Sequence, residues 1–190
     1  MSMTIYTMDE HRPGHPSFDK FSEHCVADSW GAQLRPDLYR AKGARYVHKG
    51  HRLDTDGFSA FEDDDLLELL HDYQITDLVI MGVCLEFCVR ETVIDALKNE
   101  LTPIIILDCC FAADQEKVYP ILNELMSKGA HVQHSGDIPS HIALPYNTAF
   151  MIVDVQNDFF WAAEPKPALP ILGADCIIPR INEVLQQHEC

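Results

Sequence analysis

The sequence predicts a three-layer α/β fold, with a doubly wound, mainly parallel sheet of about six strands and helices on both faces. Apolar runs rich in branched residues alternate with segments of helical periodicity, which is the pattern of parallel sheets. The chain has 190 residues, 47% of them hydrophobic, enough for one domain with a full core. The sequence contains no internal repeat and no low-complexity segment, and no linker divides it, so we expect a single domain over residues 1–190.

Six short runs of apolar and β-branched residues predict the strands, at residues 4–8, 43–48, 78–82, 103–107, 131–134 and 148–153. The run at 131–134 is short, which favours a place at or near an edge of the sheet. Apolar residues at helical spacing predict helices at 62–73, 89–97, 116–128 and 174–188. Proline and glycine exclude a helix from the polar loop 9–18.

The charge of the chain excludes two classes of partner. The 30 acidic residues outnumber the 14 basic ones, and the formal charge is -16. Phosphate backbones and anionic membranes would be repelled, so we expect neither nucleic acid nor membrane as a partner. No apolar run is long enough to cross a bilayer, and no signal-peptide pattern is present. We therefore expect a cytoplasmic protein.

The seven cysteines are an odd number and contain no CxxC pair. In a chain of this length they favour reduced thiols over a disulfide scaffold. Cys88 is the most informative of them, because it follows a buried strand and a tight turn and lies where a helix begins. A helix N-terminus favours a thiolate, so we predict a nucleophile. The alternative is a buried structural cysteine, which is the commoner role.

A candidate metal site follows the first strand. Asp9 and His11 are two residues apart, which places both side chains on the same side of an extended segment, and His24 follows in the next loop. Two imidazoles and one carboxylate suit Zn²⁺, Fe²⁺ or Mn²⁺ with positions left for water or substrate. The alternative is a loop of solvated histidines. For His15 we favour a supporting or surface role over that of a further ligand.

Four predicted strand ends carry reactive groups. Lys49 ends the second strand and Asp154 directly follows the sixth, where a buried carboxylate is costly unless it has a partner or a role. Together with Asp9 and Cys88 they should converge on the carboxyl edge of the sheet, where α/β folds bind ligands. A cysteine, a carboxylate for proton transfer and a lysine for charge form a nucleophilic set.

Several motifs together resemble the isochorismatase-like cysteine hydrolase superfamily, and within it the nicotinamidase branch. They are the metal motif at 9–11 and 24–32, the lysine segment at 49–50 and 58–61, the nucleophile turn at 82–89, and the family's opening strand with its catalytic aspartate at 151–159. The resemblance covers nearly the whole chain. It implies a circularly permuted order, because the family's first strand and helix stand at about 148–190 here. The N- and C-termini of the family's usual chain order would here be joined through residues 136–147.

The resemblance implies a catalytic mechanism for amide hydrolysis. Cys88 would attack a carboxamide carbonyl, Asp154 would take the thiol proton and pass it to the leaving ammonia, and Lys49 would hold the thiolate and orient Asp154. Backbone N–H groups of Cys84 and Cys88 would form the oxyanion hole. The family also carries a cis peptide bond just before the residue that matches Cys84.

The resemblance also implies a cofactor and a substrate class. Asp9, His11 and His24 would hold a divalent metal, zinc before iron or manganese, which binds a pyridine nitrogen. Phe159 and Phe21 would flank the ring of this small-molecule amide. Family members often self-associate, which makes a homo-oligomer an expectation by resemblance.

Alternative functions remain open at this stage. Cys84 stands where the family commonly has alanine, and such changes affect the pocket more than the catalytic set. Another small amide, of ureido or carbamoyl type, is therefore a second substrate class. Isochorismate hydrolysis is disfavoured, because family members of that type lack the cysteine matching Cys88. A non-catalytic metal-binding or thiol redox protein, using Cys84, Cys88, Cys109 and Cys110, is the third alternative.

Overall fold

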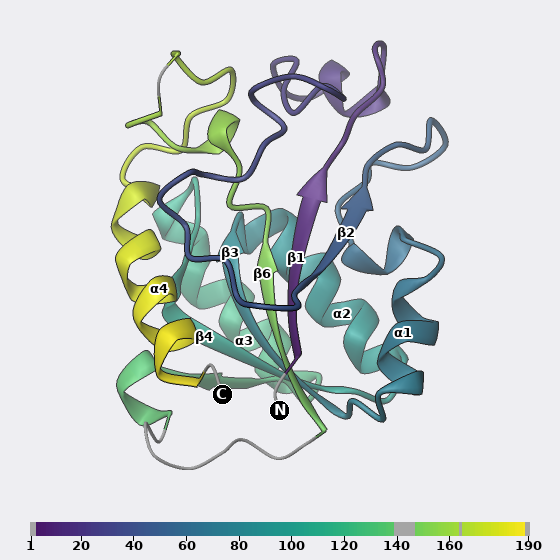
Figure 1. Cartoon of the computed structure of the whole chain (residues 1–190), viewed down its shortest axis with the longest axis vertical. Coiled ribbons are helices and arrows are strands. Elements are labelled where there is room, and N and C mark those ends of the chain that lie inside the picture. The colour runs from purple at the N-terminus through teal and green to yellow at the C-terminus, as the bar shows by residue number, and fades with distance from the viewer. Residues whose placement is uncertain (1–2, 139–146, 164, 189–190) are drawn as a thin grey trace.

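The computed structural model describes residues 3–138, 147–163 and 165–188, and it has the α/β architecture predicted from the sequence (Figure 1). One sheet has the strand order β2-β1-β6-β3-β4-β5, and every strand pair in it is parallel. The strands are β1 (Met3–Asp9), β2 (Arg45–Lys49), β3 (Asp77–Val83), β4 (Thr102–Phe111), β5 (His131–Gln133) and β6 (Thr148–Val153). The short strand β5 lies at an edge, as predicted.

Helices cover both faces of the sheet. The helices are α1 (Leu66–Asp72), α2 (Arg90–Lys98), α3 (Val118–Ser127) and α4 (Ile177–His188). Buried residues of α1, α2 and α3 belong to one apolar cluster, and those of α4 belong to a second cluster. Strand β3 supplies both, since Leu78 and Ile80 join the first cluster and Val79 and Met81 the second. This alternation with period two is what a strand buried on both faces requires.

Several predicted boundaries differ from the structure. The helices expected at 116–128 and 174–188 begin at Val118 and Ile177, each after a 3₁₀ turn. The helix expected at 62–73 begins only at Leu66, because Asp63 is extended (φ −71°, ψ 118°) and separates it from a short 3₁₀ helix at Ala60–Glu62. The prediction that proline and glycine exclude a helix from loop 9–18 is wrong at its end. There, Pro16–Asp19 form a 3₁₀ helix with the proline in its first turn, where proline is tolerated.

The topology brings together the strand ends that matter for a site. Strands β2, β1, β6 and β3 are neighbours, so their carboxyl ends lie side by side at the upper edge of the sheet in Figure 1. Strand β6 comes late in the chain yet lies between β1 and β3. The predicted junction at 136–147 lies largely outside the described residues. Within the described part of the chain, no helix combines the length and apolarity needed to cross a membrane.

Candidate active site

A buried lysine lies at the centre of the site. Lys49 ends β2 and is completely buried, and its Nζ lies 2.5 Å from Asp9 Oδ1 and 2.8 Å from Asp154 Oδ2. The same ammonium lies 3.5 Å from Cys88 Sγ. The structure therefore brings together all four groups that the sequence places at strand ends. A buried cation of this kind requires compensating charge, and the two carboxylates supply it.

Cys88 lies in an irregular turn between strand and helix. The Val83–Cys84 peptide bond is cis, as the resemblance implied. The chain then makes a π-helical turn over Leu85–Val89, and α2 follows directly from Arg90. Single π turns occur frequently at functional sites. Cys88 is 6% exposed, so its sulfur is enclosed yet reaches a cavity.

The protonation states in this group are set by burial and by Lys49. Burial disfavours a thiolate and raises the pKa of Cys88 well above its ordinary value, although the lysine opposes this. Burial also raises the pKa of Asp154, against the opposing charge of Lys49. For Asp9 burial acts in the same direction, but the lysine and His11 outweigh it and lower the pKa of Asp9. The two carboxylates therefore differ in basicity, and Asp154 is the better proton acceptor.

Asp154 is held in an unusual backbone conformation. Its φ is +53°, in the left-handed region that residues other than glycine rarely adopt. The Thr7 hydroxyl donates to Asp154 Oδ1 at 2.7 Å. Its Oδ2 faces the ammonium at 2.8 Å, outside the alignment of a hydrogen bond. The donor atoms of Asp9, Cys88 and Asp154 lie within 4.8 Å of one another. Since the Lys49 ammonium already contacts all three, this group does not suit a metal.

The residues predicted to bind a metal also lie together. The donor atoms of Asp9, His11 and His24 lie within 4.8 Å of one another, and all three residues are buried. The Nδ1 atoms of both histidines face backbone carbonyls, at 2.8 Å from Gly50 O and 2.6 Å from Ser22 O. An Nδ1–H that donates to a carbonyl leaves Nε2 as the free lone pair, which is the arrangement of a metal-binding histidine.

The chemistry of this donor set fits a divalent ion such as zinc. Burial lowers the pKa of His24, which favours the neutral imidazole that a metal requires, whereas for His11 the neighbouring Asp9 outweighs burial and raises the pKa. His15 does not complete the set, because its ring nitrogens lie 2.7 Å from Ser17 Oγ and 2.8 Å from Arg52 O. It stacks on His11 instead, with ring centroids 4.3 Å apart. The supporting role stays a prediction, and this stacking is the contact on which it would depend.

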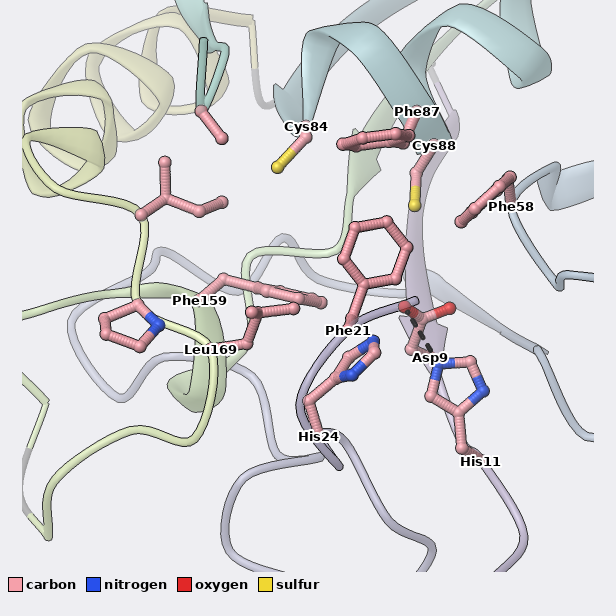
Figure 2. A pocket seen from close by; sticks show the side chains of 13 residues that line it. Asp9, His11, Phe21, His24, Phe58, Cys84, Phe87, Cys88, Phe159 and Leu169 are labelled. Atoms are coloured by element: carbon pink, nitrogen blue, oxygen red, sulfur yellow. Dashed lines mark ion pairs between the residues drawn. The ribbon is translucent and has the colours of Figure 1, made fainter. Parts of the chain in front are cut away.

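An aromatic pocket joins the candidate metal ligands to Cys88 (Figure 2). Phe21 and Phe159, which the resemblance assigns to substrate binding, both line it. Figure 2 shows the sulfurs of Cys84 and Cys88 on one side of this pocket and the rings of His24 and His11 on the other, with the Asp9 carboxylate between His11 and Cys88. The remaining lining residues are Phe58, Phe87, Ala113, Leu169, Pro170 and Ile171. A flat apolar molecule with polar groups at both ends suits such a space.

Sequence reasoning missed several of these residues. Phe58 lies in the lysine segment and Phe87 in the nucleophile turn, so the motifs could have predicted that both residues line the pocket. The segment 169–171 comes from a loop without periodicity and gave no signal. Gln156 was also missed. It is completely buried and its side chain forms hydrogen bonds with both backbone groups of Asp9, at 2.8 Å each.

Comparison with known proteins identifies relatives of the chain. Residues 2–137 match the Isochorismatase domain family. The nicotinamidase of Escherichia coli (strain K12) is 38% identical over 94 residues, 46% of this chain. That alignment spans 44% of the E. coli protein, less than half of its length.

Two solved structures extend the comparison. The pyrazinamidase of Pyrococcus horikoshii in complex with zinc has a TM-score of 0.63 at 30% identity, covering 68% of this chain and 74% of that chain. PnC1 from L. infantum in complex with nicotinate has a TM-score of 0.65 at 27% identity, covering 77% and 73% respectively.

Proposed function

The chain belongs to the isochorismatase family, and we propose that it is a metal-assisted cysteine amidohydrolase that converts nicotinamide to nicotinate and ammonia. One observation carries the proposal. The Lys49 ammonium lies 3.5 Å from Cys88 Sγ and contacts the carboxylates of Asp9 and Asp154. Cys88 lines an aromatic pocket that His11 and His24 also line, and these histidines lie beside Asp9 as candidate metal ligands. The names of the relatives, nicotinamidase and pyrazinamidase, agree with this substrate class.

The first half of the reaction forms a thioester. Asp154 accepts the proton of the Cys88 thiol while Sγ bonds to the carboxamide carbon. The same proton then passes to the amide nitrogen, the carbon–nitrogen bond breaks and ammonia leaves. The raised pKa of Asp154 suits both transfers, because a carboxylate of higher basicity is a better proton acceptor and its acid remains available as a donor. Lys49 stabilises the negative charge that moves between sulfur and carboxylate.

The second half releases the acid. Asp154 takes a proton from water as the water oxygen attacks the thioester carbon. The carbon–sulfur bond breaks, the proton on Asp154 returns to the Cys88 sulfur, and the acid leaves as nicotinate after releasing its remaining proton to solvent. In both halves the carbonyl oxygen becomes negative, and the backbone N–H groups of Cys84 and Cys88 stabilise it. A single donor of this kind contributes about 3 kcal/mol in other enzymes.

Substrate placement depends on the opposite end of the pocket. Asp9, His11 and His24 would hold the divalent ion, for which zinc is our first choice. A bound ion supplies a Lewis acid for the pyridine nitrogen. Phe21 and Phe159 enclose the flat ring, and the ring of Phe159 lies 5.6 Å from that of His24. The substrate is thereby fixed at both ends, which is how positioning raises the rate of a bimolecular step.

The test is the release of ammonia and nicotinate from nicotinamide by zinc-loaded protein, before and after chelation. We expect equal amounts of both products and a rate that falls on chelation and recovers when zinc returns. Ureido and carbamoyl amides are assayed beside nicotinamide as the competing substrate class. Folded, zinc-loaded protein that releases ammonia only from those amides would overturn the nicotinamide assignment.

A further inference from the structure

We propose that Asp158 is a positioning residue, whose carboxylate fixes both the loop that carries the metal ligands and the wall of the pocket opposite the cysteine. The proposal rests on the proposed function for the identity of the ring substrate. Asp158 belongs to the short 3₁₀ helix at Asn157–Phe159, and it is 7% exposed. Its two oxygens accept hydrogen bonds from different parts of the chain.

One oxygen of the Asp158 carboxylate holds the loop that carries His24. Asp158 Oδ2 accepts from the backbone N–H of Cys25 at 2.8 Å. Cys25 directly follows His24, and its carbonyl accepts from the backbone N–H of His11 at 2.9 Å. A single backbone unit thus connects the carboxylate to two of the three candidate ligands.

The conformation of Cys25 makes this hydrogen bond important. Its φ is +43°, a conformation that residues other than glycine adopt only where surrounding contacts hold it. A hydrogen bond from a backbone N–H to a carboxylate is roughly twice as strong as one between neutral groups. If the bond is lost, we expect the turn at Cys25 to relax and His24 and His11 to move apart.

The other oxygen holds the far wall. Asp158 Oδ1 accepts from the N–H of Ala168 at 2.9 Å, and the backbone carbonyl of Asp158 accepts from Leu169 at 3.2 Å. The Leu169 side chain lines the pocket and lies near Phe159 in Figure 2. The same carboxylate therefore connects the surface that encloses the ring to the loop that binds the metal.

Gly31 shows how closely the carboxylate is enclosed. A Cβ atom at this glycine would lie 1.9 Å from Asp158 Oδ2, so any larger residue would displace that oxygen. The Gly31 carbonyl also accepts from the backbone N–H of Asp158 at 3.2 Å. Gly31→Ala consequently disturbs the same hydrogen bond without changing the carboxylate itself.

The experiment measures zinc affinity by chelator competition, together with kcat and KM for nicotinamide at saturating zinc. Asp158→Asn keeps the size of the side chain but replaces one acceptor by a donor that faces a backbone N–H. We expect the zinc dissociation constant to rise about tenfold or more, as for other residues that orient metal ligands. We also expect KM to rise more than kcat falls, and Gly31→Ala to change both quantities in the same direction.

Asp108→Asn is the matched control. Asp108 also accepts a backbone N–H, from Ser135 at 2.8 Å, but it is not a lining residue of the pocket. Its variant should bind zinc as the wild type does even if it unfolds at a lower temperature. Wild-type zinc affinity and KM in both Asp158→Asn and Gly31→Ala would overturn the proposal. If wild-type protein fails to hydrolyse nicotinamide, the zinc measurement still decides the role of Asp158 in the metal loop.

Discussion

Among the residues of the site, Asp154 has a pKa that burial and neighbouring groups shift in opposite directions. Burial raises its pKa, whereas Lys49 and the Thr7 hydroxyl favour the charged form. The proposed mechanism needs that charged form to accept the thiol proton. Activity should therefore fall as the pH drops below the raised pKa of Asp154, because the protonated acid accepts no proton. This loss should begin above the ordinary value of 3.8 for a carboxyl group.

Thr7→Val should shift the acidic side of the pH–activity profile to higher pH. The substitution removes the hydrogen bond of 2.7 Å to Asp154 Oδ1, which stabilises the carboxylate. The pKa of Asp154 should rise further, so kcat/KM at saturating zinc should begin to fall at a higher pH than in the wild type. Thr92→Val is the control, since Thr92 is buried but accepts from Ala60 N instead. An acid limb that stays in place, or moves to lower pH, would exclude Asp154 as the base.

Residue-level contacts were only partly accessible from sequence. Asp9, Lys49, Cys88 and Asp154 were predictable because each is a reactive side chain at the end of an apolar run. The hydrogen bond from Thr7 to Asp154 joins residues 147 apart in sequence. Such pairs depend on which strands become neighbours, and a hydroxyl in a strand pattern gives no local signal for them.

Among the elements, the turn between β3 and α2 positions Cys88, the proposed nucleophile. Gly82 lies in β3 with a φ of +127°, at the point where the pairing of β3 with β4 shifts register. A Cβ there would lie 2.0 Å from the carbonyl oxygen of Val153, the last residue of β6. Glycine thus permits the close approach that brings Cys88 and Asp154 together at adjacent strand ends.

Gly82→Ala should therefore be severely destabilising. The clash is with the backbone of a buried neighbouring strand, so β3 and β6 must separate. We expect a loss of about 3 kcal/mol or more in the free energy of unfolding, measured by denaturant titration. Gly136→Ala is the matched control, because a Cβ there meets nothing within 4 Å, and its effect should stay within about 0.5 kcal/mol. Equal stability of the two variants would contradict this account of the turn.

The strands were predictable because long apolar runs identify buried parallel strands from sequence alone. Helix starts were less predictable, since the 3₁₀ turns at Ala60–Glu62 and Gln115–Lys117 precede α1 and α3. These turns depend on local caps, such as the Ser59 hydroxyl that accepts from Phe61 N. Periodicity cannot separate such a turn from the helix that follows it.

For the whole molecule, the circularly permuted order that the family resemblance implies stays a prediction. The family match covers residues 2–137, and β6 and α4 follow it in sequence. We infer that β6 and α4 correspond to the first strand and helix of the family. The beginning of β1 and the end of α4 lie toward the same end of the sheet in Figure 1, so a short connection could join them.

A circular permutant in which β6 and α4 come first in the chain tests this inference. A chain that runs from 148 to 188, then through a short glycine–serine linker to 3–138, should fold and hydrolyse nicotinamide within roughly tenfold of the original rate. A second permutant opened between Ile152 and Val153, inside the buried strand β6, should not fold. If the first permutant is unfolded, or is folded without activity, the correspondence is wrong.

Ammonia release from nicotinamide, measured for variants that each lack one cysteine, tests directly whether Cys88 is the nucleophile. Cys88→Ala should lose more than about a thousandfold in kcat while keeping its zinc, because the thioester cannot form. Cys176→Ala removes an exposed thiol and should retain the wild-type rate. Substantial ammonia release by folded Cys88→Ala protein would exclude Cys88 as the nucleophile.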